Sequence, residues 1–128
     1  MLLHLSDISS EPLHGQISRQ IRAMILSGDL SEDAPLPSIR GMAREQHVSV
    51  ITVQRAYDDL EREGLIHSKR GKGFFVAKIS DVRKQEIAKL RLREKMEKIL
   101  YNGIAEGVPT RVIEQVVQDI LMSKGEKK

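Results

Sequence analysis

Residues 49–63 carry side chains that could read a nucleic acid, arranged on one face of a predicted helix. Its apolar residues recur at intervals of three and four, which predicts that the other face is buried: Val53, Ala56, Tyr57 and Leu60. An amide can pair with adenine, hydroxyls suit phosphates, and aliphatic groups can touch thymine methyls. The candidate contacts at the start and outer face of this helix are Ser49, Val50, Ile51, Thr52, Gln54 and Arg55, with Asp58 beside them. An ordinary solvent-exposed helix is the alternative.

A second cluster places two glycines among three cations, at residues 69–73. The flanking residues 65–68 and 74–76 are short and β-prone, so the sequence predicts a β-hairpin with a basic tip. Cations there would displace counterions from DNA, and glycine would let the backbone approach closely. The candidates are Arg70, Gly71 and Lys72. A charged, solvated turn is the alternative.

Two earlier helices are predicted to position these clusters. The first has an apolar stripe from Leu13 to Ile25, with Ser10 as its expected cap and Gly28 as its end. Residues 29–37 are predicted to form a loop. A short helix capped by Ser38 follows, with Arg40 near its start, where the guanidinium could hold a phosphate or a guanine. This helix and the one at residues 49–63 have the spacing of a helix-turn-helix.

The pattern is helical again from about Ile79, with breaks predicted at Gly103 and at residues 107–109. Thr110 is expected to cap a last helix, and residues 123–128 to form a polar, frayed tail. Two amphipathic helices cannot cover each other completely, so we expect a second copy of the chain to do so. Packing onto the first helix is the alternative. The predicted dimerisation residues are Leu92, Met96, Ile99, Leu100, Ile113, Val116, Val117, Ile120 and Leu121.

Composition narrows the function further. The chain has 128 residues, no cysteine and four histidines that are scattered along the sequence. The sequence therefore predicts no metal site, no cofactor and no enzyme, because neither metal-ligand spacing nor a catalytic arrangement is present. It also lacks a secretory signal and an apolar run of roughly 20 residues, which favours a cytoplasmic location without a membrane partner. The net charge is +3, and basic residues outnumber acidic ones only from Ser38 onward.

Five ordered blocks within residues 10–77 resemble the GntR family of bacterial transcription regulators. They are Pro12-Leu13 with Gln16-Ile17, Leu36-Pro37-Ser38-Ile39-Arg40, the run from Val48 to Tyr57, the run from Leu60 to Ile66, and Gly71-Lys72-Gly73-Phe74-Phe75-Val76. The short C-terminal region resembles the YtrA-type subfamily, whose members carry two helices there and dimerise through them. The resemblance implies a mainly α fold: a winged helix-turn-helix of three helices and a hairpin wing in residues 1–77, then a two-helix dimerisation hairpin in residues 78–128.

The resemblance also implies a function. Family members bind palindromic operators in double-stranded DNA as homodimers, with contacts that correspond here to Arg40, Ser49, Val50, Ile51, Thr52, Gln54 and Gly71. Many members have Arg or Asn-Pro where this chain has Val50-Ile51, so its operator sequence cannot be carried over. YtrA-type members often repress operons that encode ABC transporters and their own gene. A small-molecule effector would have to bind between the C-terminal helices or at the dimer interface.

Two other functions remain open at this stage. A sequence-independent DNA-coating protein would bind all duplexes with a steep salt dependence. A protein-interaction module would use the winged helix without DNA.

Overall fold

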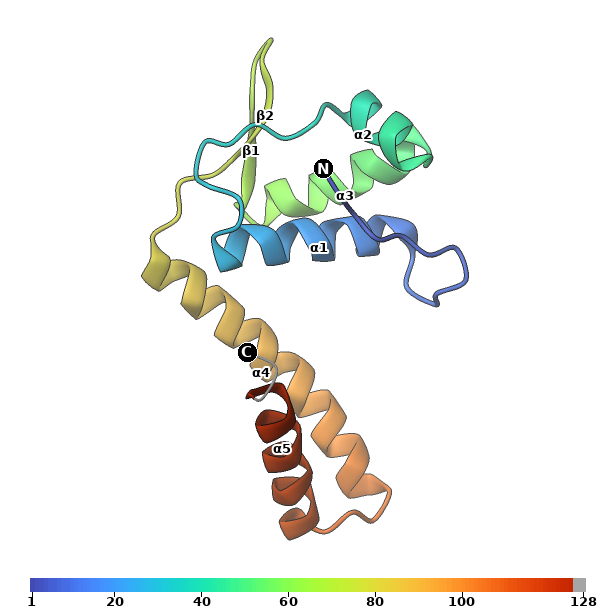
Figure 1. Ribbon diagram of the computed structural model, residues 1–128, viewed down its shortest axis with the longest axis vertical. Coiled ribbons are helices and arrows are strands. Elements are labelled where there is room, and N and C mark those ends of the chain that lie inside the picture. Colours follow the sequence, from blue (N-terminus) through green and yellow to red (C-terminus); the bar gives the residue numbers. More distant parts are fainter. Residues whose placement is uncertain (126–128) are drawn as a thin grey trace. The chain divides into compact units, whose positions relative to one another are not determined.

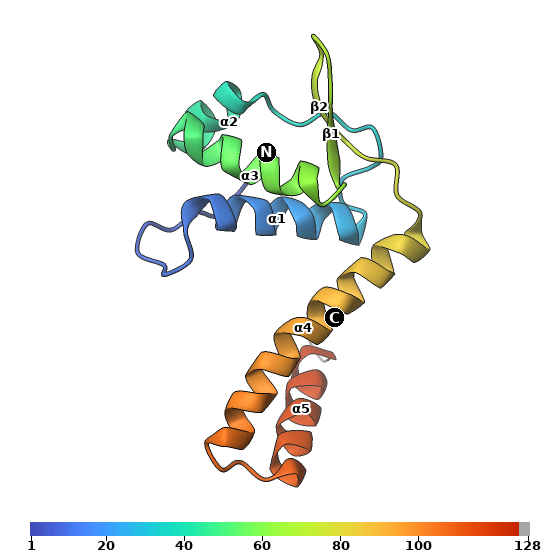
Figure 2. The same cartoon turned by 180° about the vertical axis from the view of Figure 1, so that it is seen from behind.

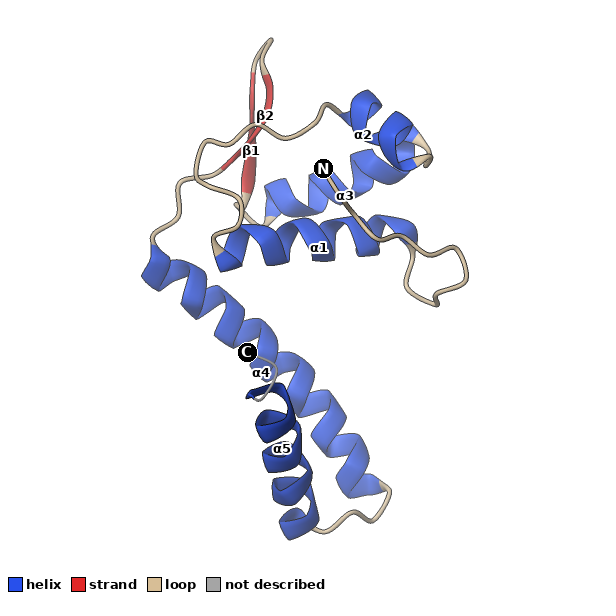
Figure 3. Cartoon of the chain, in the orientation of Figure 1, coloured by secondary structure: helices blue, strands red, loops and turns tan. Residues whose placement is uncertain are grey.

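The computed structural model describes residues 1–125 and divides into two compact units, Met1–Gln85 and Glu86–Lys128. The first unit holds three helices and a hairpin (Figure 1): α1 (Leu13–Ser27), α2 (Ile39–Gln46), α3 (Val50–Arg62), β1 (Ile66–Lys69) and β2 (Gly73–Val76). Helix α4 (Asp81–Ala105) begins in this unit, and α5 (Thr110–Gly125) belongs to the second. Figure 3 shows that helices dominate, so the predicted mainly α winged helix-turn-helix is confirmed.

Helix α3 is the centre of the first unit, because it packs against α1, α2 and β1. In both views α2 and the hairpin lie on the side of α3 that faces away from α1 (Figures 1 and 2). The predicted buried stripe of α3 is confirmed, since all four side chains are fully buried. They meet Ile17, Ile21 and Ile25 of α1 and Met42 of α2 in a core whose members are also fully buried. Burial of each valine, leucine, isoleucine or methionine side chain in this core stabilises the fold by about 1.5–3 kcal/mol.

Serine caps fix where the two helices of the helix-turn-helix begin. The hydroxyl of Ser38 accepts from the backbone N–H of Gly41, and that of Ser49 accepts from Thr52, each at 3.0 Å. These contacts satisfy amides that have no partner inside the helix. The predicted cap at Ser10 is wrong: Pro12 precedes α1, without a side-chain capping bond. The proline ring already fixes a backbone angle suited to a helix start.

The hairpin strands are antiparallel, with Ile66 opposite Val76 and Lys69 opposite Gly73. Residues 33–36, which were predicted as part of a loop, pair with the outer edge of β2. The N–H of Asp33 donates to the carbonyl of Val76 at 2.8 Å, and that of Leu36 donates to Phe74 at 2.9 Å. The hairpin therefore has a third extended segment at its edge, which ties it to the loop before α2.

Two glutamine side chains of α1 hold the N-terminal segment by paired hydrogen bonds. Gln16 accepts from the N–H of Ser6 at 2.8 Å and donates to its carbonyl at 2.9 Å. Gln20 does the same with His4, at 2.9 and 2.8 Å. Between these anchors and the chain start, Leu3 is buried. The glutamines thus satisfy backbone groups of a segment that forms no regular secondary structure.

The helix boundaries after residue 78 differ from those predicted. Ser80 accepts from the N–H of Arg83 at 3.1 Å and caps α4, slightly later than the expected start at Ile79. The break predicted at Gly103 is wrong, because α4 continues through it; one glycine costs a helix only about 1 kcal/mol. Gly107, at φ +92°, lies in the turn that follows. Thr110 is the first residue of α5 rather than its cap.

The predicted frayed tail is also partly wrong, since residues 123–125 are helical. The rest of that predicted tail, residues 126–128, lies outside the described residues. Among residues 1–125, the helices are too short or too polar to cross a lipid bilayer.

Candidate nucleic-acid interface

The N-terminal half of α3 presents a mixed polar and apolar surface to solvent. Ile51 is 70% exposed and Val50 is 43% exposed, although both are aliphatic. Gln54 and Arg55 are also exposed, and Thr52 is half-buried. Aliphatic groups at such exposure gain only part of the burial energy that a core residue gains. Their place at the start of a helix-turn-helix second helix suits contact with base edges in a major groove.

The hydroxyls of Ser49 and Thr52 lie 2.8 Å apart at the start of α3. Ser49 also accepts the backbone N–H of Thr52, so one of its two acceptor positions is in use. A hydroxyl carries one donor and two acceptor positions. One hydroxyl of the pair donates to the other, which leaves the second with a hydrogen to donate outward. This arrangement fits one hydrogen bond to a phosphate oxygen.

Arg40 is exposed in the first turn of α2, and a hydrogen bond from Tyr57 of α3 holds the backbone just before that turn. The Tyr57 hydroxyl donates to the carbonyl of Pro37 at 2.7 Å, three residues before Arg40. Burial raises the pKa of the Tyr57 hydroxyl, and the charge of Glu45 adds to this, so the hydroxyl stays protonated and keeps donating. The sequence predicted only a core role for Tyr57. A buried tyrosine needs a partner for its hydroxyl, and that is the signal that was missed.

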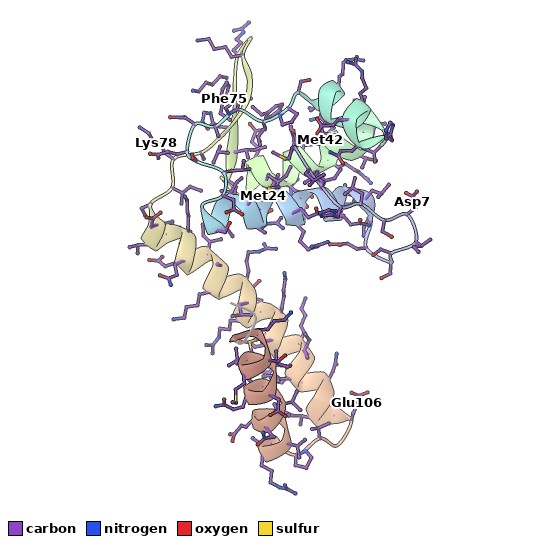
Figure 4. All side chains as sticks on the ribbon, in the orientation of Figure 1. Asp7, Met24, Met42, Phe75, Lys78 and Glu106 are labelled. Carbon is purple, nitrogen blue, oxygen red and sulfur yellow. The ribbon has the colours of Figure 1, made fainter. Side chains whose placement is uncertain are left out.

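The wing tip carries the predicted residues Arg70, Gly71 and Lys72, and all three are exposed. Gly71 has φ +74°, a conformation that favours glycine, and the N–H of Lys72 donates to the carbonyl of Lys69 at 2.9 Å. Side chains at this tip extend beyond the body of the unit (Figure 4). The tip is therefore a small, cationic protrusion with accessible backbone.

Lys69, the third cation of the cluster, is the last residue of β1, and its side chain is held by Phe75 and Asp33. Its ammonium lies 4.4 Å from the centre of the Phe75 ring and 3.8 Å from the carboxylate of Asp33. His67 stacks on the other strand's Phe75 at a centroid distance of 6.2 Å. Asp33 was not predicted, because nothing in its sequence neighbourhood signals that it meets the wing. These contacts stiffen the wing instead of adding to its charge at the tip.

A part-buried ion pair joins α1 to the end of α3. Arg22 donates from Nε to Glu63 Oε1 at 2.7 Å and from Nη2 to Oε2 at 2.6 Å. The side chain of Arg22 is 11% exposed and that of Glu63 is 31% exposed. Sequence reasoning missed this pair, because the partners are 41 positions apart. The pair holds the point at which the chain leaves α3 for the wing.

Charges of both signs follow the outer side of α3. Gln54 donates from Nε2 to Asp58 Oδ1 at 2.8 Å. Arg55 lines a shallow hollow of about 270 Å³. The other residues that line it are His14, Asp58, Asp59 and Arg62. Arg55 thus lies close to carboxylates of its own helix. Its role as a DNA contact stays a prediction, as do the roles of the other candidates.

The second unit exposes an apolar groove between its two helices. All the predicted dimerisation residues line it except Leu92 and Leu121, which are 58% and 62% exposed elsewhere on the helices. The groove measures about 350 Å³ and also includes Gly103 and Val108. Ile99 is 68% exposed and Ile120 is 54% exposed. Apolar surface of this extent typically marks an interaction site.

Comparison with known proteins agrees with this geometry. The model of the bacterial regulatory proteins of the gntR family matches residues 13–76. The chain is similar to the HTH-type transcriptional repressor YtrA of Bacillus subtilis (strain 168), with 27% identity over 99% of this chain and 98% of that protein. A GntR family transcriptional regulator from Listeria monocytogenes has a similar structure, with TM-score 0.75, 25% identity and coverage of 90% and 98% of the two chains.

A third similar structure is the DNA-binding domain of AraR in complex with an operator. It has TM-score 0.52 and 29% identity, and it covers 60% of this chain and 95% of that domain. The family match spans the helix-turn-helix and the wing, and the similarity to YtrA continues through α4 and α5. The chain therefore belongs to the gntR family of bacterial regulatory proteins.

Proposed function

We propose that this chain binds a palindromic operator in double-stranded DNA as a homodimer and represses transcription. The observation that carries the proposal is the exposed first half of α3, which carries aliphatic and hydrogen-bonding side chains together, in a unit that also exposes Arg40 and a cationic wing. A helix of this kind enters the major groove with its first residues against the bases. Arg40, Thr52, Gln54, Arg70 and Lys72 are the contacts on which the proposal depends.

Fixed geometry supports sequence-specific binding over simple coating of DNA. Tyr57 joins α3 to the loop before Arg40, and residues 33–36 join that loop to the wing. A rigid set of contacts loses little conformational entropy on binding, and it meets only DNA of matching shape. A DNA-coating protein would need cations without this fixed spacing.

The apolar groove of the second unit supports the dimer. It opens to solvent in the single chain, and exposed aliphatic residues surround it. A second copy would bury both grooves at one symmetric interface. Two copies would also present two α3 helices to two half-sites, which matches a palindrome. Repression follows where the operator overlaps a promoter, because the bound dimer excludes polymerase.

The test is fluorescence anisotropy of the purified chain on DNA from upstream of its own gene. The resemblance to YtrA-type regulators directs the search there and to operons that encode ABC transporters. A scrambled duplex of equal length is the control, and both are measured over a series of salt concentrations. The proposal expects a preference of about a thousandfold or more and a palindromic footprint.

The rival functions give different results. Equal affinity for both duplexes with a steep salt dependence would establish the DNA-coating function. Absence of binding to either duplex at low salt, together with capture of a protein partner, would establish an interaction module.

A further inference from the structure

Gln54 and Asp58 lie one helical turn apart on α3, and a hydrogen bond of 2.8 Å joins Nε2 to Oδ1. Both residues are exposed. A carboxylate can only accept, so the amide nitrogen of Gln54 must face Asp58, and the amide oxygen lies on the other branch. We propose that Asp58 is a positioning residue that orients the Gln54 amide and makes it select adenine over guanine. This inference rests on the proposed function, in which α3 lies in a major groove.

Base chemistry connects this orientation to selectivity. Adenine offers an acceptor at N7 and a donor at N6, whereas guanine offers acceptors at both N7 and O6. With one Nε2 hydrogen held by Asp58, Gln54 has one N–H donor and one oxygen acceptor left. That set matches adenine. Guanine would instead place its O6 against the amide oxygen, or would require the hydrogen that Asp58 holds.

Without Asp58 the amide would be free to turn. It could then direct its nitrogen toward the base and offer both hydrogens, which suits guanine. Removing the carboxylate also removes a negative charge from the DNA-facing helix. That charge affects every sequence alike, so it changes overall affinity and leaves the ratio of affinities for adenine and guanine unaltered. The ratio therefore reports orientation alone.

The experiment first selects binding sites from random duplexes with the full chain and with Gln54→Ala. The position whose preference Gln54→Ala abolishes is the one that Gln54 reads. Anisotropy then compares duplexes with adenine or guanine at that position. We expect the wild type to prefer adenine by about tenfold or more. Asp58→Ala should reduce this preference to about threefold or less, with the other selected positions unchanged.

The chain offers a matched control in its second unit. Gln115 donates from Nε2 to Asp119 Oδ1 at 2.8 Å, with the same spacing along α5. Asp119→Ala therefore removes the same bond and the same charge, and it should leave the adenine preference at the wild-type value. Thermal melting followed by circular dichroism should show both variants folded, because an exposed pair of this kind contributes only about 0.2–0.5 kcal/mol as a helix-stabilising contact.

The double variant Gln54→Ala with Asp58→Ala shows whether Asp58 affects base selection through Gln54 or by contacting a base itself. If Asp58 only positions Gln54, Asp58→Ala changes no base preference further when Gln54 is already alanine, although overall affinity can still change with the lost charge. If the double variant loses preference at a position that Gln54→Ala leaves selected, Asp58 reads a base itself, which overturns the inference. Wild-type selectivity in Asp58→Ala, or a guanine preference in the wild type, would also overturn it. A wild-type chain that selects no sequence would refute the proposed function, and the inference with it.

Discussion

Breaking the ion pair between Arg22 and Glu63 should lower the stability of the first unit. Glu63→Gln keeps the shape of the side chain and removes its charge. The guanidinium of Arg22, 11% exposed, would then remain buried without a counter-charge, and one of its two donors would face an amide N–H. A buried charge that loses its partner is strongly destabilising, because water no longer replaces the lost contact.

The magnitude follows from the burial of the two partners. Loss of one member of a fully buried pair costs about 3–5 kcal/mol. The Glu63 side chain is 31% exposed, so water already screens part of the interaction. We therefore expect a loss of about 2 kcal/mol in the free energy of unfolding, less than the fully buried value. For a unit of this size that corresponds to a fall in melting temperature of about 10 °C.

Urea and thermal unfolding followed by circular dichroism measure this loss. The matched control is Glu11→Gln, because Arg19 Nε lies 3.1 and 3.0 Å from the two oxygens of Glu11, but both side chains are more exposed. Its expected cost is about 0–1 kcal/mol. Replacing both partners of the pair, as Arg22→Met with Glu63→Leu, should recover most of the stability. The reasoning is refuted if Glu63→Gln costs no more than the control.

Four further predictions concern binding, stability and assembly. Arg40→Ala should weaken operator binding by about 1–3 kcal/mol in anisotropy titrations if Arg40 reads a base with two hydrogen bonds, and a much smaller loss would remove it from the contacts. Lys72→Ala should weaken all duplexes alike and reduce the slope of log affinity against log salt by about one. Tyr57→Phe should cost about 1–2 kcal/mol of unfolding free energy, since the carbonyl of Pro37 loses its donor. Because the pKa of Tyr57 is raised in the folded state, only the unfolded tyrosine loses its proton above about pH 10, so wild-type stability falls as the pH rises further. The free energy of unfolding, measured with urea at several pH values, should fall less in Tyr57→Phe. Ile120→Asp should yield a monomer in analytical ultracentrifugation, and a dimer that persists would exclude the groove as the interface.

Periodicity predicted the elements that carry the candidate site. The stripe through Val53 and Leu60 specifies one buried helix face, and Ser38 and Ser49 mark two helix starts by chemistry that is local in sequence. From these signals follow the two helices, the exposed face of α3 and the glycine-containing wing. Local rules suffice where the interacting groups lie within one turn of each other.

The contacts that sequence reasoning missed are long-range. Asp33 and the residues after it pair with β2, although the two prolines at positions 35 and 37 argue against a strand. Gln16 looks like a surface residue of α1, yet it is 2% exposed and holds the N-terminal segment. Gly103 predicted a break that α4 does not show, because a single unfavourable residue is outweighed by the helix around it. The contacts of Asp33 and Gln16 depend on distant partners that periodicity cannot identify.

The fastened segment between the wing and α2 acts as a spacer of fixed length. Hydrogen bonds join residues 33–36 to β2 and Pro37 to Tyr57. The backbone just before Arg40 therefore cannot take up an extra residue without a shift of Arg40. A residue inserted at positions 34–37 would shift Arg40 against the wing by up to about 3.3 Å, roughly one base-pair step. One inserted at positions 29–32, ahead of the first of these bonds, could bulge outward at little entropic cost. Natural or engineered length variation should therefore be confined to the earlier stretch.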